Sequence, residues 1–181
     1  MNFVIGTDNL GSRIVLADDE WPGVIRTAGY VAGDIEAVTG VRPEVSLILC
    51  GDDTDCAAAF EMLKPGNIYA ATVGHSALLD RLADSGVIDL TEISGKREVY
   101  LFRLIDTDEG SPALVIAGSD KRGTIYGLFK LSEKLGVSPW VYFADAVPAH
   151  RDNVVITEND NYVSREPSVE YRGIFINDEW P

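Results

Sequence analysis

The chain has 181 residues, of which 46% are hydrophobic and 24% are charged, which fits one globular domain or one domain with a short extension. Its formal net charge of -14 opposes binding to nucleic acid or to anionic membrane surfaces, because both reward Lys and Arg. No run approaches the roughly 20 apolar residues of a membrane span, and the first residues lack the basic start of a secretion signal. We therefore expect a soluble protein without nucleic-acid or membrane partners. It is cytoplasmic as written, or secreted or periplasmic if a leader was removed.

Cys50 and Cys56 are the only cysteines, and they flank the polar segment GDDTD. The chain has two histidines, so neither residue type supplies a set of ligands at zinc spacing, and we predict no metal site. Cys50 ends an apolar run and Cys56 begins a predicted helix, which favours two separate packed thiols. A disulfide between them stays open if the compartment is oxidising.

In the first half of the chain, two short strands are predicted over residues 2–6 and 12–17, joined by a polar turn. Trp21-Pro22 marks the start of a helix, because proline is favoured in the first helical turn, and Gly40 marks its end. Apolar residues at three- and four-residue spacing predict its buried face: Val24, Ala28, Val31, Ile35 and Val38. The apolar run 45–50 predicts a strand covered on both faces, and a short helix is predicted over 56–63.

In the second half, residues 68–73 predict a buried strand, and residues 74–76 begin a helix that carries Leu78, Leu79 and Leu82. Residues 98–105 alternate between apolar and polar side chains, which predicts a strand nearer the sheet edge than the uniformly apolar run 113–117. A helix over 122–135 and a short strand over 154–157 follow. Because strands alternate with helices, we predict an α/β domain in which helices pack on a mixed, largely buried sheet in two or three layers.

The last eleven residues, YRGIFINDEWP, place three hydrogen-bonding side chains directly after a predicted apolar strand at 173–176. These side chains are Asn177, Asp178 and Glu179. In barrel enzymes the catalytic groups lie at the carboxyl ends of strands. We therefore expect a truncated enzyme whose catalytic partner domain is missing. The polar segment 152–167 is the most linker-like, so we predict a non-catalytic front domain over 1–165, with the linker and the first strand of a truncated catalytic barrel over 166–181.

Residues 118–127, GSDKRGTIYG, lie between a predicted buried strand and a predicted helix, which is where phosphate-binding turns occur. The segment matches neither GxxxxGK(S/T) nor GxGxxG, so nucleotide binding is not favoured. The favoured interpretation is structural. Asp120 caps the helix, while Gly123 and Gly127 allow close packing against the sheet with Tyr126 beside them.

His75 follows a predicted strand, where a base or a metal ligand could stand, but it has no partner at metal-ligand spacing. A histidine at a helix start that makes one hydrogen bond is the favoured interpretation. Ser76 lies outside any GxSxG motif and is no nucleophile candidate. Trp140, Tyr142 and Phe143 form an aromatic cluster that could stack on a sugar, although core packing or a domain interface is favoured.

Three stretches together resemble the amino-terminal part of glycoside hydrolase family 115, which comprises large multidomain xylan α-1,2-glucuronidases. The stretches are TVGHSALLDRL, VIAGSDKRGTIYGLFKLSEKLGVSPW and EPSVEYRGIFINDEWP. The resemblance runs from about Gly40 to the last residue and is clearest after Ala113. The pattern G-x-x-x-R-G-x-x-Y-G also resembles front domains of family 67 α-glucuronidases and β-hexosaminidases.

The resemblance implies a front domain followed by a (β/α)8 barrel that removes glucuronic or 4-O-methylglucuronic acid from xylan with inversion and without a cofactor. In the family, IFINDE is the first barrel strand. Asn177, Asp178 and Glu179 thus become substrate-binding candidates at the active-site rim, Asp178 foremost, and we assign no catalytic residue.

An inverting mechanism needs two carboxyl groups roughly 6.5–9.5 Å apart across the sugar, and one strand cannot hold both. We therefore expect this chain to be inactive alone. Its expected partners are the catalytic barrel of the same polypeptide and xylan-derived glucuronosyl saccharides. Residues 140–148 are less rich in tryptophan than we expect of the family. Two alternatives stay open, namely a stand-alone carbohydrate-binding module and a scaffold whose apolar face docks on the barrel.

Overall fold

The computed structural model describes residues 1–48, 63–107, 109–141 and 143–174. Its main sheet has six strands in the order β3-β2-β4-β6-β5-β8. The strands β2 (Arg13–Ala17), β3 (Glu44–Ile48), β4 (Ile68–Thr72) and β6 (Ala113–Gly118) run parallel. The strand β5 (Tyr100–Ile105) is antiparallel to β6, and β8 (Tyr162–Val163) is antiparallel to β5. The predicted mixed α/β sheet is confirmed.

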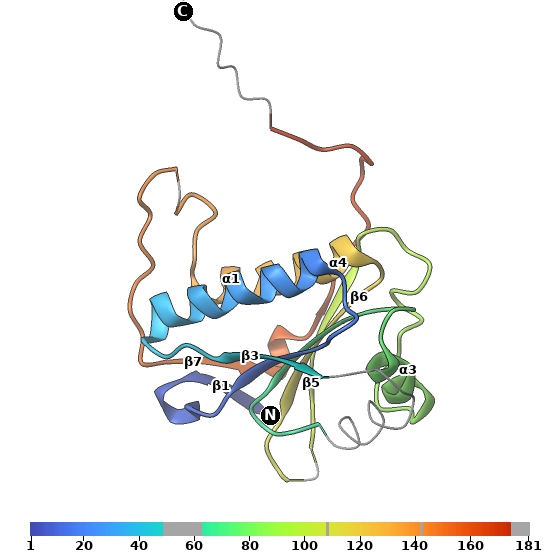
Figure 1. Ribbon diagram of the computed structural model, residues 1–181, viewed down its shortest axis with the longest axis horizontal. Coiled ribbons are helices and arrows are strands. Elements are labelled where there is room, and N and C mark those ends of the chain that lie inside the picture. Colours follow the sequence, from blue (N-terminus) through green and yellow to red (C-terminus); the bar gives the residue numbers. More distant parts are fainter. Residues whose placement is uncertain (49–62, 108, 142, 175–181) are drawn as a thin grey trace, which may run out of the picture.

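Helices cover both faces of this sheet, so the domain has three layers. The helices α1 (Pro22–Thr39) and α4 (Lys121–Leu135) lie side by side on one face, and α3 (Ala77–Asp84) lies against the other (Figure 1). Side chains along a strand alternate between the two faces. On β6, Leu114 and Ile116 therefore join the core beneath α1 and α4, while Val115 and Ala117 join the core beneath α3.

A second sheet joins the two ends of the domain. The strand β1 (Asn2–Gly6) pairs antiparallel with β7 (Asn153–Thr157), and Phe3, Ile5, Val154 and Ile156 bury their side chains in the core under α1 and α4. The turn after β1 holds the 3-10 helix η1 (Thr7–Asn9), and it leads to β2 in the main sheet. The two predicted strands at the amino terminus thus belong to different sheets.

The segment that looked most linker-like in the sequence is folded. Residues 153–163 contain β7, the 3-10 helix η2 (Glu158–Asp160) and β8, which pairs with β5. The alternation of buried Val154 and Ile156 with exposed Val155 is the signal of a half-buried strand that the polar surroundings hide.

Both long helices begin and end where the sequence predicts. All five residues predicted for the buried face of α1 are at most 1% exposed. Gly40 follows α1 at φ 74°, and Gly136 follows α4 at φ 87°. Glycine accepts this left-handed conformation without steric cost, which is why it ends a helix.

One strand prediction is wrong. The strand β3 was expected to be covered on both faces, yet it lies at the end of the six-stranded sheet and Leu47 is 46% exposed. The edge prediction for 98–105 fits better, because β5 is bounded by β8, which has only two residues. Gly173 and Ile174 are not in a strand. Cys50, Cys56 and the predicted helix at 56–63, except its last residue, lie outside the described residues, as does the rest of the predicted last strand.

Candidate functional site

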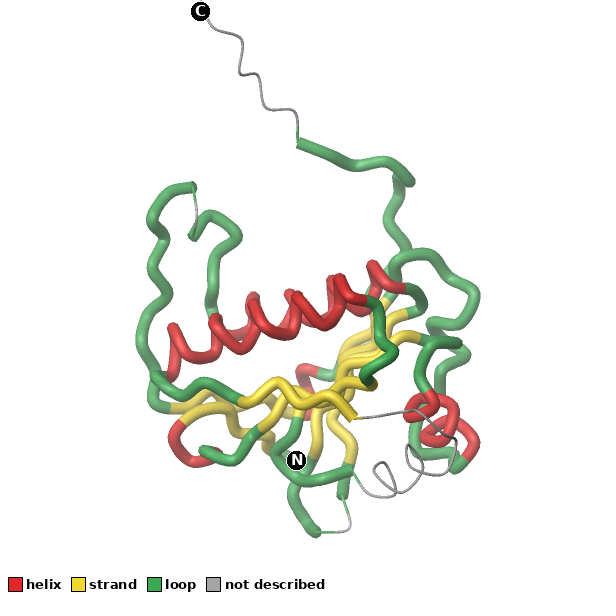
Figure 2. Tube along the Cα trace, in the orientation of Figure 1, coloured by secondary structure: helices red, strands yellow, loops and turns green. Residues whose placement is uncertain are grey.

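The predicted substrate-binding residues Asn177, Asp178 and Glu179 lie outside the described residues. The segment that leads to them is described, and it leaves the body of the domain beside α4 (Figure 2). We call residues 164–172 the exit strap. Its contacts determine how the chain approaches the predicted site.

The first half of the exit strap is bound to the residues that precede and begin β5. Ser164 donates its backbone N–H to the carbonyl oxygen of Tyr100 at 2.9 Å, and its hydroxyl accepts the Tyr100 N–H at 2.8 Å. Arg97 donates its backbone N–H to Glu166 at 2.8 Å and its guanidinium to the carbonyl oxygen of Pro167 at 3.0 Å. The strap thus continues the line of β8 along β5.

The second half of the strap is held by a buried carboxylate, that of Glu98, whose side chain is 4% exposed. Its Oε1 accepts a hydrogen bond from Arg122 of α4 at 2.9 Å, and its Oε2 accepts one from Arg172 of the strap. Arg172 also donates to the hydroxyl of Tyr126 at 3.2 Å. We call Glu98, Arg122, Tyr126 and Arg172 the Glu98 cluster.

The hydrogen bond from Arg172 lowers the pKa of the Glu98 carboxyl below its usual value, although burial acts in the opposite direction, and Arg122 lowers it further. Glu98 is therefore ionised at neutral pH. Its backbone φ of 57° is uncommon for a residue with a Cβ atom. The cluster combines a buried charge with an unfavourable backbone conformation.

The GSDKRGTIYG segment surrounds this cluster and has the structural role predicted for it. Asp120 accepts the N–H of Gly123 at 2.8 Å and so caps α4, as predicted, and its second oxygen accepts the N–H of Glu98 at 2.8 Å. A Cβ atom on Gly123 would lie 2.2 Å from the carbonyl oxygen of Val99, so only glycine fits there. Arg122, which the sequence analysis left without a role, orients Glu98.

A second polar cluster lies where the sheet topology reverses. The chain moves from β2 to β3 in one direction and then returns to place β4 on the other side of β2, which is the arrangement that creates ligand crevices in open α/β sheets. In this chain the side chain of Glu20, which is 2% exposed, occupies the place where such a crevice would lie. Its carboxylate accepts the N–H of Thr72 at 2.8 Å, the hydroxyl of Thr72 at 2.9 Å and the N–H of Trp21 at 2.9 Å. We interpret Glu20 as a structural brace between strand ends.

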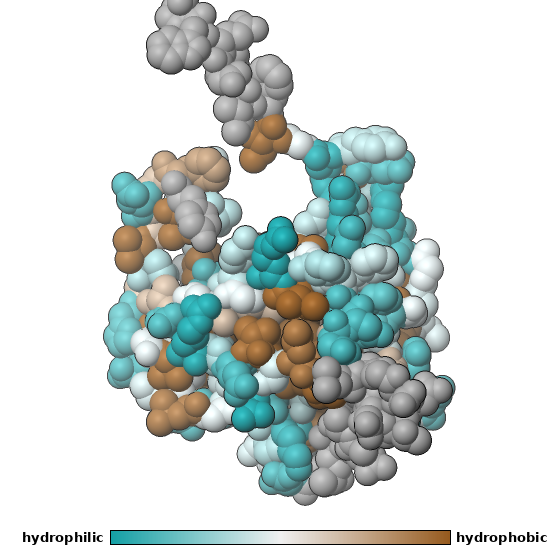
Figure 3. Space-filling view, in the orientation of Figure 1, coloured by the Kyte–Doolittle hydropathy of each residue, from teal (hydrophilic) through white to brown (hydrophobic). Residues whose placement is uncertain are grey.

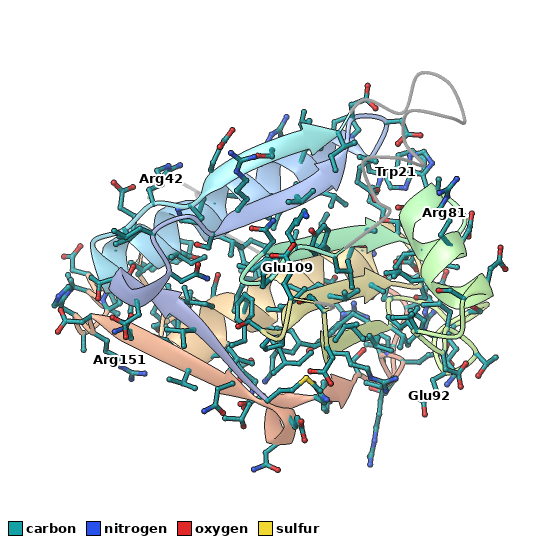
Figure 4. The ribbon with its side chains drawn as sticks, turned by 90° about the horizontal axis from the view of Figure 1, so that it is seen from below. Trp21, Arg42, Arg81, Glu92, Glu109 and Arg151 are labelled. Carbon is teal, nitrogen blue, oxygen red and sulfur yellow. The ribbon has the colours of Figure 1, made fainter. Side chains whose placement is uncertain are left out.

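Trp21 and His75 stack at the same end of the sheet, with ring centroids 4.5 Å apart, and the ammonium of Lys121 lies 5.6 Å from the Trp21 ring. Figure 4 shows Trp21 at the end of the molecule that carries α3, opposite Arg42 and Arg151. Among the described residues, the His75 ring makes a stacking contact and no hydrogen bond, whereas the sequence predicted one hydrogen bond. No three His, Cys, Asp or Glu residues in the described ranges are grouped to hold a metal ion.

A groove of about 950 Å³ lies on the outer side of α1 and α4, against the loop that follows α4. Its lining is mainly apolar: Tyr30, Asp34, Phe129, Glu133, Val137, Ser138, Pro139 and Val141. Figure 3 shows the hollow above the helices between that loop and the exit strap. We call it the helix groove.

Two members of the predicted aromatic cluster stand beside the helix groove. Trp140 is 62% exposed and Phe143 is 74% exposed, and their rings meet edge to face at 6.2 Å. The prediction that these side chains pack in the core is therefore wrong for both residues. A domain interface or a contact with a sugar stays open for them. Tyr142 lies outside the described residues.

Sequence reasoning missed Glu98, Arg172 and the helix groove. Glu98 stands beside Arg97 at the start of a strand, where a charged residue is normally solvated, and no local pattern distinguishes it. Arg172 lies inside EPSVEYRGIFINDEWP, a stretch that carries the family resemblance but gives no sign of its contact with Glu98. The groove residues Tyr30 and Phe129 stand off the apolar stripes of their helices, and that was a readable signal.

No helix in the described ranges is both long and apolar enough to cross a membrane. No protein-family model matches the chain, and no curated protein matches it. Among solved structures, a family GH115 4-O-methyl-α-glucuronidase with specificity for decorated arabinogalactans is 29% identical with a TM-score of 0.71. The match covers 97% of this chain and 20% of that chain.

A second structure, of CpGH84D, has a TM-score of 0.50 at 8% identity, and the match covers 86% of this chain and 20% of that one. At that identity the likeness shows the fold alone. The chain thus spans about a fifth of the length of each of these two structures. The chain is a GH115-like domain related to glycoside hydrolases, as the sequence resemblance predicted.

Proposed function

We propose that this chain is the front domain of a larger glycoside hydrolase that removes glucuronic or 4-O-methylglucuronic acid side chains from a plant polysaccharide. The observation that carries the proposal is the likeness to the GH115 α-glucuronidase over 97% of the chain at a TM-score of 0.71. The sequence resemblance implies xylan as the polymer. The matched enzyme has specificity for decorated arabinogalactans, so both polymers belong in the test.

In this proposal the chemistry belongs to a catalytic barrel of the same polypeptide, and the front domain is inactive alone. An inverting glycosidase requires two carboxyl groups on opposite sides of the sugar, roughly 6.5–9.5 Å apart. The two most buried carboxylates among the described residues are Glu20, which accepts three protein hydrogen bonds, and Glu98, which accepts two. Both therefore have structural partners rather than an opening toward a substrate.

We infer that the helix groove is the face that docks on this barrel. Tyr30 is 54% exposed and Phe129 is 43% exposed in the groove, and large exposed apolar patches on soluble domains mark interaction sites. Substituting both residues by Ser should improve the solubility of the 181-residue chain. In the intact gene product, the same double change should weaken the contact between the front domain and the barrel, and the unfolding temperature should therefore fall.

The decisive experiment compares the 181-residue chain with the intact gene product for release of uronic acid from glucuronoxylan and from arabinogalactan. We expect release by the intact product only, and loss of that release in an Asp178→Ala variant. Asp84→Ala, which removes an exposed acid at the end of α3, is the matched control and should leave activity unchanged. Comparable rates from the 181-residue chain and the intact product would refute the proposal.

A second function is favoured by the exposure of Trp140 and Phe143, namely a carbohydrate-binding module. Paired exposed aromatic rings can stack on sugar faces. Titration with xylo-oligosaccharides, followed by tryptophan fluorescence, tests this function in the 181-residue chain. A saturable shift at millimolar ligand that disappears in Trp140→Ala would establish sugar binding. A flat titration would exclude sugar binding and leave docking on the barrel as the proposed role of this face.

A further inference from the structure

The Glu98 cluster is costly to build, which suggests a purpose beyond packing. A carboxylate that is removed from water loses its hydration, and a positive φ strains any residue with a Cβ atom. Such features persist where the surroundings enforce them, and they gather at functional positions. Here the surroundings are visible, because Asp120 fixes the N–H of Glu98 at 2.8 Å and the Ser119 hydroxyl fixes the N–H of Val99 at 3.0 Å.

Only one member of the cluster comes from outside the body of the domain. Glu98 lies two residues before β5, and Arg122 and Tyr126 belong to α4, whereas Arg172 belongs to the exit strap. Arg172 also donates to the carbonyl oxygen of Val169 at 2.7 Å, and its guanidinium lies 5.9 Å from the Tyr126 ring. The planar guanidinium is thus held in one orientation by contacts on several sides.

Arg122 fixes the orientation of the Glu98 carboxylate. It occupies Oε1 of Glu98, so Oε2 is the oxygen presented to Arg172. The Arg122 side chain is 61% exposed and the Arg172 side chain is 35% exposed, whereas Glu98 is 4% exposed. The buried carboxylate is therefore the fixed point, and the strap is the part that it restrains.

We propose that Glu98 is a positioning residue whose carboxylate, oriented by Arg122, fixes Arg172 and so sets the course of the chain toward Asn177, Asp178 and Glu179. Arg172 precedes Asn177 by five residues, which span at most about 18 Å. Restraint at Arg172 therefore acts close to the predicted substrate-binding residues. The inference rests on the proposed function, and it adds a residue of the front domain to the determinants of the site.

The first test uses the 181-residue chain labelled with ¹⁵N, with heteronuclear NOE and amide exchange as readouts. In Glu98→Gln, which keeps the size and the backbone strain, we expect the amides of residues 168–173 to become mobile. The amides of α1, β4 and β6 should stay protected. Arg172→Gln removes the strap member and should give the same response without any change in the buried core. Glu92→Gln breaks an exposed ion pair with Arg103 (3.7 Å) and is the matched control.

The second test places the same variants in the intact gene product and measures uronic acid release. We expect Glu98→Gln and Arg172→Gln to lower kcat/KM by about tenfold to a hundredfold, as small misplacements of a site do, in variants that remain folded. Glu92→Gln should leave kcat/KM unchanged.

Two results would overturn the inference: strap amides that stay rigid in Glu98→Gln, or a mobile strap with an unchanged kcat/KM. If the unsubstituted gene product releases no uronic acid, the proposed function fails on the wild type alone. The amide measurements would then still decide whether Glu98 holds the strap.

Discussion

The close approach of α4 to the sheet makes Gly127 a sharp test of the packing. Gly127 faces the core, and a Cβ atom built there would lie 2.5 Å from Cγ2 of Ile116 and 3.2 Å from Cβ of Tyr100. Carbon atoms pack at about 3.5–4.0 Å, so Gly127→Ala must displace the helix or the strand by about 1 Å. Gly29, in the middle of α1, has nothing within 4 Å of such an atom and is the matched control.

The two substitutions share one effect and differ in the other. Alanine in place of glycine inside a helix adds about 1 kcal/mol of stability in either position. Overpacking at Gly127 costs about 1–3 kcal/mol, whereas Gly29→Ala meets no contact. We therefore expect Gly29→Ala to be about 1 kcal/mol more stable than wild type, and Gly127→Ala to fall below Gly29→Ala by about 1–3 kcal/mol.

Urea unfolding followed by circular dichroism measures both free energies. In a chain of this size the expected difference corresponds to about 2–12 °C in the unfolding temperature. If the two variants proved equally stable within about 0.5 kcal/mol, the close contact between α4 and β6 would be disproved, and the reasoning about both glycines of the motif would fail with it.

Three further predictions concern polar groups that are buried or partly buried. Glu20→Gln should lower the free energy of unfolding by about 1–3 kcal/mol, because one donor from Trp21 or Thr72 loses its acceptor, and urea unfolding will show it. Burial raises the pKa of Tyr100 to about 12, above the unfolded value, so stability should fall as pH rises through that interval, which phenolate absorbance follows. The hydrogen bond from Lys134, followed by those from Thr157, lowers the pKa of Asp160, so its stabilisation is present above about pH 4 and is lost on acidification. Lys134→Met should reduce that loss in acid unfolding, while the part that depends on Thr157 remains.

The sequence predicted those parts of the fold that depend on local periodicity. The spacing of Val24, Ala28 and Val31 gave the buried face of α1, and glycine gave its end. The burial of β3 was misjudged because an apolar run does not reveal whether a further strand will lie beside it. Strand order follows from long-range pairing, which a single sequence does not express.

In the candidate site, too, the local features were predictable and the contacts between distant residues were not. The role of Asp120 was predictable, because a helix cap acts over three residues. The contact between Glu98 and Arg172 joins residues 74 apart in the sequence, and neither side chain shows its partner through local spacing. The aromatic pair at Trp140 and Phe143 was recognised as a cluster, yet its exposure depends on where the loop after α4 runs.

The pairing of β1 with β7 has a consequence for how this protein is made. Asn2 lies opposite Thr157, so β1 leaves the ribosome long before β7 supplies the partners of its backbone groups. Until then β1 presents an unpaired edge and an apolar face to other nascent chains. Contacts of such long sequence separation also slow folding. Synthesis that stops short of β7 would leave Phe3 and Ile5 without the strand that covers them, which makes early release of the chain a route to aggregation.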